Sequence, residues 1–149
     1  MLNDVEVIKG DMGHVFELQE LEESSKDIIR PWSLRMFLDS FNNDNFKCYI
    51  LRRFNELVGY IAFNDLGTEY EILRLVISQN FRRYGCATRL LQFLVNLADL
   101  NEVSDLILDV SHMNRPALTL YTRFGFVPDG LRKDYYGKDE DAVLMRKKL

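Results

Sequence analysis

The sequence predicts a mixed α/β fold, and three observations lead to this class. Stretches in which polar and apolar residues alternate, as in strands, lie between stretches with apolar residues at helical spacing. Turn residues separate these stretches, and no repeat, low-complexity tract or linker interrupts them. Hydrophobic residues fill 47% and charged residues 28% of the 149 positions, which is typical of one globular core. We therefore expect a single domain over residues 1–149.

The first half of the chain is predicted to form a strand, two helices and three strands. Their expected ranges, in that order, are residues 5–8, 14–23, 33–41, 46–54, 56–64 and 71–77. Pro31 disfavours helix in the residue before it, and Ser33 can cap the second helix. The last of these strands alternates strictly. This pattern predicts residues 71, 73, 75 and 77 on one face and residues 72, 74 and 76 on the other.

The second half is predicted to continue as helix, strand, helix and strand. The expected ranges are residues 86–100, 106–110, 115–124 and 142–145. Gly85 precedes the first helix, whose apolar stripe consists of Leu90, Leu91, Leu94, Val95 and Ala98. Asn114 can cap the second helix and Gly125 can end it. Between that helix and the last strand, the tail alternates only in pieces.

Charge and hydropathy exclude several classes of protein. The chain carries 19 basic and 23 acidic side chains, a net charge of -4, which argues against a general nucleic-acid binder. The longest apolar run, over residues 90–100, contains polar residues and is too short for a bilayer span. The N-terminus lacks the basic and then apolar order of a signal peptide. We expect a cytoplasmic protein without a nucleic-acid or membrane partner, and the oligomeric state stays open.

The cysteines and histidines predict neither a metal site nor a disulfide. Cys48 and Cys86 lie far apart in the chain, and the histidines are His14 and His112. A thiol at a helix N-terminus can have a depressed pKa, which would make Cys86 a candidate nucleophile. No histidine lies near it in the sequence, so we expect two free thiols without a catalytic role.

The strand, loop and helix over residues 72–100 carry the clearest chemical signal. A loop that enters a helix through Gly85 and small residues leaves backbone N–H groups uncovered at the positive end of the helix dipole. Such a place can bind phosphate. The Gly-Lys-Ser/Thr of a Walker A loop and the Gly-x-Gly-x-x-Gly of a dinucleotide site are both absent from the loop. The alternative is that Gly85 only makes a tight turn beside two solvated arginines.

Two motifs in this region resemble those of the Gcn5-related N-acetyltransferases, the GNAT superfamily. The (Arg/Gln)-x-x-Gly-x-(Gly/Ala) signature is matched by Arg82-Arg83-Tyr84-Gly85-Cys86-Ala87. The second signature, Asn-x-x-Ala-x-x-Leu-Tyr-x-x-x-Gly-Phe, resembles the segment from Asn114 to Phe126. The resemblance implies a central, mostly antiparallel twisted sheet with helices on both faces, and an enzyme that transfers an acetyl group from acetyl-CoA to an amine.

A narrower resemblance is to the RimI family of ribosomal-protein-alanine N-acetyltransferases. It rests on Pro31-Trp32-Ser33, on Arg132-Lys133-x-Tyr135-Tyr136 and on Glu140-Asp141-Ala142-x-x-Met145. The chain departs from that family at Asp109, where the family has a catalytic glutamate. The favoured acceptor is therefore a protein N-terminal α-amine, with a ribosomal protein as the implied partner. The alternatives are a small amine such as an amino acid, polyamine or antibiotic, and a non-catalytic acyl-CoA sensor.

The resemblance also implies which residues bind acetyl-CoA. Main-chain groups of Leu75, Val76 and Ile77 are expected to pair with the pantetheine as an added strand would. Backbone N–H groups of the loop and first helical turn are expected to hold the pyrophosphate. These residues are Arg83, Tyr84, Gly85, Cys86, Ala87 and Thr88, and Arg82, the first residue of the signature, is also expected to bind the cofactor. Asn114 can contact the cofactor, or serve only as a helix cap.

Acetyl transfer needs an unprotonated amine and a protonated leaving thiol. An α-amine titrates near ~8 and a lysine near ~10.4, so a carboxylate base suits the α-amine better. Glu71 and Asp109 are both candidates for this base, and each can instead be a surface carboxylate on a strand. The resemblance makes Tyr121 the acid that protonates the thiolate, although Tyr121 can also be a packing residue.

Three aromatic residues are candidates for the acceptor groove. They are Trp32, Tyr135 and Tyr136, which stand in the segments that resemble the RimI family. Aromatic residues at such places are as often packing residues, so both roles stay open.

Overall fold

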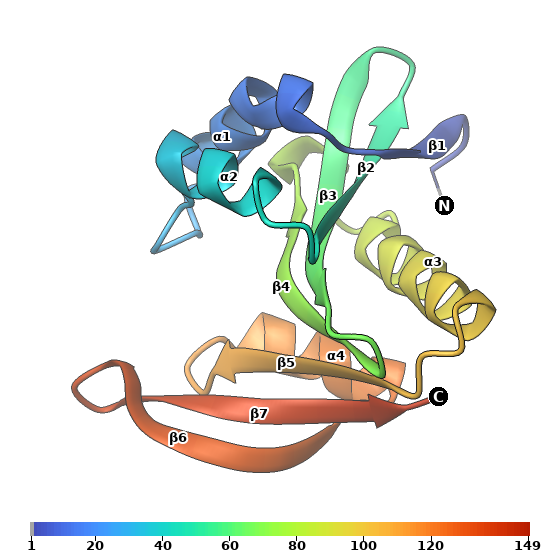
Figure 1. Cartoon of the computed structure of the whole chain (residues 1–149). Coiled ribbons are helices and arrows are strands. Elements are labelled where there is room, and N and C mark those ends of the chain that lie inside the picture. The colour runs from blue at the N-terminus through green and yellow to red at the C-terminus, as the bar shows by residue number, and fades with distance from the viewer. Residues whose placement is uncertain (1) are drawn as a thin grey trace.

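The computed structural model describes residues 2–149, which form a seven-stranded sheet in the order β1-β2-β3-β4-β5-β7-β6 (Figure 1). The strands are β1 (Val5–Lys9), β2 (Phe46–Arg53), β3 (Glu56–Asp65), β4 (Glu69–Ile77), β5 (Asp105–Ser111), β6 (Val127–Gly137) and β7 (Glu140–Lys148). The helices are α1 (Val15–Ser24), α2 (Leu34–Phe41), α3 (Cys86–Leu100) and α4 (Arg115–Phe124), with short 3₁₀ turns at Met12–His14 and Gln79–Phe81.

The sheet is antiparallel except between β4 and β5, which pair in parallel. It twists strongly, so that β5, β6 and β7 cross the direction of β3 and β4 in Figure 1. Helices α1 and α2 lie on one side of the upper part of the sheet, and α3 lies on the other side. The predicted class, a mostly antiparallel twisted sheet with helices on both faces, is confirmed.

Two hydrophobic clusters hold these layers together. The first joins α3 and α4 to one face of the sheet and contains Leu90, Leu91, Leu94, Ala98, Leu106, Leu108, Val110 and Tyr121. The second joins α1 and α2 to the other face and contains Val15, Leu18, Leu21, Phe37, Ile50, Tyr60 and Val76. The stripe predicted for α3 is therefore in the core, because its residues recur every three or four positions along the helix.

Local capping explains where α2 and α4 begin and where α4 ends. The Ser33 hydroxyl accepts a hydrogen bond from the Met36 N–H at 3.2 Å, and the Asn114 side chain accepts one from the Ala117 N–H at 3.2 Å. Gly125 ends α4 with a φ of +106°, which side chains other than glycine rarely adopt. The predicted caps and this stop signal are confirmed.

The C-terminal tail differs from the prediction. Residues 142–145 were expected as one short last strand, but the tail forms the long hairpin of β6 and β7. Nearly all of β6 is exposed, so it shows no alternation of buried and exposed residues. Its pairing with β7 is also irregular, with register shifts on either side of residues 130–132. The hairpin therefore depends on pairing with β7, which periodicity alone does not reveal.

Strand β4 also departs from the expected alternation. Ala62 of β3 pairs with Arg74 and Phe63 pairs with Ile72, so Leu73 forms a bulge with no partner. The prediction that Ile72 and Val76 share a face is wrong: Ile72 packs in the α3 cluster and Val76 in the α1/α2 cluster. Side chains in a strand alternate between the two faces of the sheet. The extra residue at Leu73 therefore moves each later side chain of β4 to the face opposite the one that strict alternation predicts.

Residues 2–149 contain no group of three or more His, Cys, Asp or Glu side chains placed to hold a metal ion. No helix in this range is long and apolar enough to cross a membrane. Cys48 and Cys86 are free and buried. Burial raises the pKa of the Cys48 thiol to about 12 and also raises the pKa of Cys86. Burial therefore works against a reactive thiolate at Cys86, despite its place at a helix N-terminus.

Candidate functional site

The centre of the candidate site is a fork between β4 and β5. The two strands pair from Glu69 with Asp105 to Ile72 with Leu108, and the pairing then stops. Beyond this point β4 continues beside β3 and β5 continues beside β7, so the two strands diverge (Figure 1). The edge of β4 that faces the fork therefore has no strand partner over residues 73–77. Main-chain groups of a free edge can bind an extended ligand as an added strand.

The predicted strand residues for the cofactor lie on this free edge. Leu75, Val76 and Ile77 pair with β3 on their other edge, which holds the β4 backbone in place. The carbonyl of Ile77 accepts a hydrogen bond from Arg82 Nε at 3.2 Å. The bulge at Leu73 lies just where the strands separate. Together these features present a row of fixed backbone groups beside the fork.

The N-terminus of α3 lies at the end of this edge and suits an anion. Gly85 is the N-cap residue with a φ of +76°, and it gives no side-chain cap to the first-turn N–H groups of Cys86, Ala87 and Thr88. Arg83, two residues earlier, also has a positive φ, of +68°. A Cβ at Gly85 would meet no atom within 4 Å, so the space beside the turn is open. Exposed N–H groups at a helix N-terminus favour phosphate.

A groove of 390 Å³ runs from this turn between α3 and α4. Its lining residues are Thr88, Pro116, Thr119, Leu120, Arg123 and Phe124. Among the predicted cofactor residues, the groove includes Thr88 alone. Apart from Thr88, the lining comes from α4. Of these residues only Leu120 is a fixed position of the second signature, so the signature itself does not indicate the rest of the groove.

Two of the predicted cofactor residues use their side chains elsewhere. The Arg82 guanidinium pairs with Asp27 through contacts of 2.5 and 3.0 Å, which lowers the pKa of Asp27. Asn114 caps α4 through its side chain. The side chains of Arg83 and Tyr84, by contrast, are both exposed. Arg82 therefore ties the α1–α2 loop to the turn before α3, and its side chain is not free for a phosphate.

Tyr121 of α4 is nearly buried in the cluster that contains α3 and the buried side of β5. Its side chain is 8% exposed, and its ring lies edge-on to Phe126 with 5.4 Å between the centroids. Burial raises the pKa of Tyr121, and the positive charge of Arg74 acts in the opposite direction. The phenol therefore stays protonated at neutral pH and keeps a proton that it can donate.

The two candidate carboxylates lie at different places relative to the fork. Glu71 lies within the paired part of β4, opposite Ile107, and accepts a hydrogen bond from Asn64 Nδ2 at 3.3 Å. Asp109 is the first residue of β5 beyond the last pair with β4. Its charge also raises the pKa of Tyr136, after the larger effect of burial, which indicates that the two side chains are near each other. Asp109 therefore borders the opening, whereas Glu71 lies behind it.

A buried polar cluster that the sequence did not reveal supports the fork from the α1 side. Glu22 of α1 is fully buried and accepts hydrogen bonds from the Tyr60 hydroxyl, the Arg74 guanidinium and the Trp32 N–H, the last at 2.9 Å. Burial is the largest single effect on the pKa of Arg74 and acts to lower it, but the hydrogen bond to Glu22, the charge of Glu22 and the contact with Tyr60 together outweigh burial, and the pKa is raised. Burial and Glu22 raise the pKa of Tyr60 well above its usual value. The cluster fixes a positive charge beside Tyr121.

The predicted aromatic residues are spread over two segments. The Trp32 ring packs against Phe37 at 5.3 Å, and the Arg74 guanidinium lies 5.6 Å from its centroid. Tyr135 and Tyr136 follow each other on β6, with 5.0 Å between their centroids. Tyr136 is half-buried, and Tyr135 is more than half exposed. Trp32 is thus a packing residue beside Arg74, and the two tyrosines lie next to each other on strand β6 of the hairpin.

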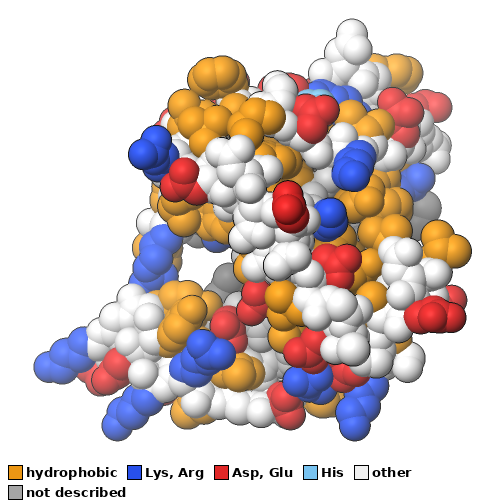
Figure 2. Space-filling view, viewed as in Figure 1, with side chains coloured by type: hydrophobic (Ala, Val, Ile, Leu, Met, Phe, Trp, Pro, Cys, Tyr) orange, Lys and Arg blue, Asp and Glu red, His pale blue; other side chains and the backbone are white. Residues whose placement is uncertain are grey.

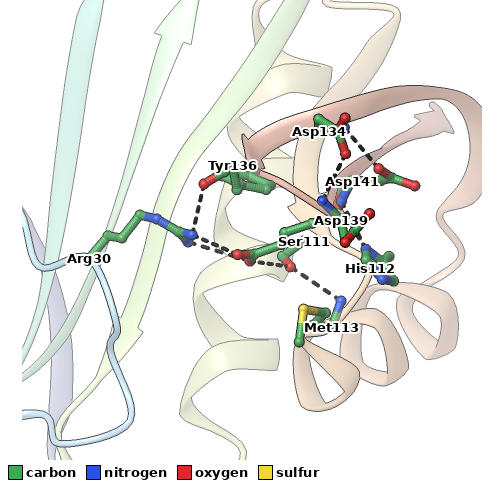
Figure 3. A network of polar contacts seen from close by, with 9 residues as sticks. Arg30, Ser111, His112, Met113, Asp134, Tyr136, Asp139 and Asp141 are labelled. Atoms are coloured by element: carbon green, nitrogen blue, oxygen red, sulfur yellow. Dashed lines mark hydrogen bonds and ion pairs between the residues drawn. The ribbon is translucent and has the colours of Figure 1, made fainter.

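Figure 3 shows a polar bridge between these two segments. Arg30 of the α1–α2 loop reaches Glu140 at 2.6 Å and the main-chain carbonyl of Tyr136 at 3.0 Å. Glu140 also accepts a hydrogen bond from the Ser111 hydroxyl at 2.7 Å. In the sequence, Glu140 stands out only as part of a motif, and Arg30 and Ser111 belong to no predicted site. The sequence does not show which distant residue a charged side chain will contact, so the bridge could not be predicted from it.

Comparisons with known proteins agree with this geometry. The sequence model of the acetyltransferase (GNAT) family matches residues 14–126. A [ribosomal protein bS18]-alanine N-acetyltransferase from Haemophilus ducreyi is 30% identical over 146 residues, which cover 93% of this chain and 94% of that protein.

Two solved structures share the fold. The ribosomal-protein-S18-alanine N-acetyltransferase from Escherichia coli matches with a TM-score of 0.87 and 20% identity, covering 97% of this chain and 93% of that one. A GNAT family acetyltransferase from Elizabethkingia anophelis with acetyl-CoA bound matches with a TM-score of 0.77 and 18% identity, covering 99% and 100%.

Proposed function

Because this chain belongs to the GNAT family of acetyltransferases, we propose that it transfers an acetyl group from acetyl-CoA to the α-amine at a protein N-terminus. The observation that carries the proposal is the fork, which has a free edge of β4 and the carboxylate of Asp109 where β5 leaves β4, while the protonated Tyr121 packs against the buried side of β5. The Haemophilus ducreyi relative, named for an alanine of ribosomal protein bS18, makes such a protein the first acceptor to test. The proposal places the enzyme in the cytoplasm, where ribosomal proteins are found.

The residues around the fork fit acetyl-CoA. Backbone groups of Leu75, Val76 and Ile77 are available for its pantetheine, and the uncapped first turn of α3 for its pyrophosphate. The groove between α3 and α4 continues from that turn and offers the Arg123 side chain. When bound, acetyl-CoA supplies the acetyl thioester that an amine attacks.

Two side chains, Asp109 and Tyr121, are each assigned one proton transfer. Asp109 accepts the proton of the acceptor ammonium, directly or through a water molecule, so that the amine lone pair becomes free. Tyr121 donates its hydroxyl proton to the departing sulfur as the C–S bond breaks, and the second proton, which the nitrogen loses on becoming an amide, passes through solvent and restores the phenol. Arg74 holds a positive charge near Tyr121, which favours the negative charge that develops as the thioester is attacked. Asp109 is favoured over Glu71 because it borders the opening.

The choice between the two carboxylates can be tested directly. We expect Asp109→Asn to lower kcat/KM for an α-amine peptide at pH 7 by about tenfold or more, because only about a tenth of an amine with a pKa near ~8 is neutral there. Above pH 8 the amine loses its proton without help, so the deficit should shrink. Glu71→Gln serves as the matched control and should keep most of the activity. A larger loss in Glu71→Gln than in Asp109→Asn would reverse the assignment.

The proposed acceptor class is tested by following thiol release from acetyl-CoA. The panel contains hexapeptides with a free N-terminal alanine, N-terminally blocked peptides with one lysine, and small amines such as amino acids and polyamines. We expect turnover on the free α-amine peptides alone, because their lower amine pKa suits one carboxylate base. Turnover confined to the small amines would overturn the proposed acceptor and leave the family and cofactor unchanged.

A further inference from the structure

The bridge from Arg30 to the hairpin spans the side of the site from which an acceptor would approach. Asp105, Ile107, Asp109 and Ser111 alternate with the buried residues of β5, so Asp109 and Ser111 face the same side of the sheet. The Ser111 hydroxyl donates to Glu140, and Glu140 pairs with Arg30. The bridge therefore stands over the strand end that carries Asp109.

Several contacts hold the bridge in one place. The Arg30 guanidinium contacts both carboxylate oxygens of Glu140, at 2.6 and 3.4 Å, and lies 5.2 Å from the centre of the Tyr136 ring. The hydrogen bond from Arg30 lowers the pKa of Glu140, so Glu140 remains charged at neutral pH. We call Arg30, Ser111, Tyr136 and Glu140 together the Arg30 latch.

The loop that carries Arg30 is anchored on both sides of it. Asp27 is paired with Arg82, and the Trp32 N–H is bonded to the buried carboxylate of Glu22. Arg30 thus extends from a fixed loop to a fixed strand end. Figure 2 shows an opening between the α1 and α2 part of the molecule and the hairpin below it, with basic side chains along its outer border. The latch encloses this passage where an open groove would otherwise lie.

The position of the latch fixes which part of an acceptor it would meet. Ser111 lies two residues beyond Asp109, about 7 Å along the strand at roughly 3.3 Å per residue. An extended peptide whose amine lies at Asp109 covers the same distance in about two residues. For a peptide that runs along β5 from Asp109 toward Ser111, the second and third residues would therefore lie beneath the latch.

We propose that the Arg30 latch is a specificity determinant that admits acceptors with small second and third residues and excludes acceptors that are bulky there. This rests on the proposed function, since it takes the acceptor to be a peptide chain. The enclosed passage limits side-chain size, whereas an open groove would let a large side chain point into water. The latch touches no reacting atom, so it affects acceptor choice and not the chemical step.

The test compares two hexapeptides with free N-terminal alanine that differ only in glycine or tryptophan at the third position. For the unaltered enzyme we expect kcat/KM to favour the glycine peptide by about tenfold or more. Arg30→Ala should reduce this ratio at least about threefold, mainly by improving KM for the tryptophan peptide. Arg30→Lys, which keeps the charge and most of the reach, should preserve the ratio.

Two controls separate the latch from other effects. Arg35 forms an exposed pair with Asp39 within α2, at 3.7 Å, so Arg35→Ala removes a similar surface charge away from the latch and should leave the ratio unchanged. An alanylglycine amide places no side chain beneath the latch and should be used equally by the unaltered enzyme and by Arg30→Ala. A ratio near one in the unaltered enzyme, or an unchanged ratio in Arg30→Ala, overturns the latch alone. No turnover on any peptide overturns the proposed acceptor and the latch with it.

Discussion

Replacing Tyr121 with phenylalanine should lower kcat by roughly a hundredfold or more, since a positioned general acid contributes about 10² to 10⁴ in rate. The substitution removes only the hydroxyl, so the ring keeps its edge-on contact with Phe126. Burial raises the pKa of this phenol, and the hydroxyl is therefore protonated at the pH of the assay. Without it, the departing thiolate must take its proton from water.

The experiment needs the affinity for acetyl-CoA as well as the rate. We expect the dissociation constant for acetyl-CoA, measured by calorimetry, to change less than about threefold, because backbone groups are expected to make the main contacts. Tyr49→Phe is a suitable control, since Tyr49 is half-buried between Phe63 and Phe93, away from the fork. Unchanged turnover in Tyr121→Phe would remove Tyr121 from the role of acid.

Replacing Glu22 with alanine should cost about 3–5 kcal/mol of unfolding free energy, the loss expected when one partner of a buried ion pair is removed. Glu22 is fully buried, and its three partners would each lose an acceptor. Arg74, whose side chain is 21% exposed, would keep a charge with no counterion beside it. Urea unfolding followed by circular dichroism measures the loss.

A double variant and a surface control make this test specific. Glu22→Leu combined with Arg74→Met removes both charges and should be more stable than Glu22→Ala, because an apolar pair replaces an uncompensated charge. Glu17 pairs with Arg52 at 2.6 Å but is 45% exposed, so Glu17→Gln should cost no more than about 1 kcal/mol. If Glu22→Ala were no less stable than Glu17→Gln, the buried cluster would not be what secures α1 to the sheet.

Several features of the fold could be predicted from short segments because their causes are local. The Ser33 and Asn114 caps bond to N–H groups three residues away, and the stripe of α3 follows from the pitch of one helix. The two GNAT motifs lie where a strand turns into α3 and along α4, so the family and its cofactor were also predicted from the sequence and are confirmed. In each case, residues within a few positions of one another decide the structure.

Other features depend on residues that are far apart in the chain. Glu71 lies within the apolar strand β4, and Asp109 lies near the end of the apolar strand β5. Only the register of β4 with β5 shows which of the two carboxylates borders the fork. The bulge at Leu73 depends on the pairing with β3, and β6 has no periodicity of its own.

The polar contacts around the site join residues that are far apart in the sequence. Glu22 meets Arg74 across 52 positions, and Arg30 meets Glu140 across 110. A side chain of either kind is an ordinary charged residue in its own segment, since nothing in its neighbours along the chain indicates burial or a partner. Such charges acquire a role only when chain folding removes water around them and brings the opposite charge within hydrogen-bonding distance.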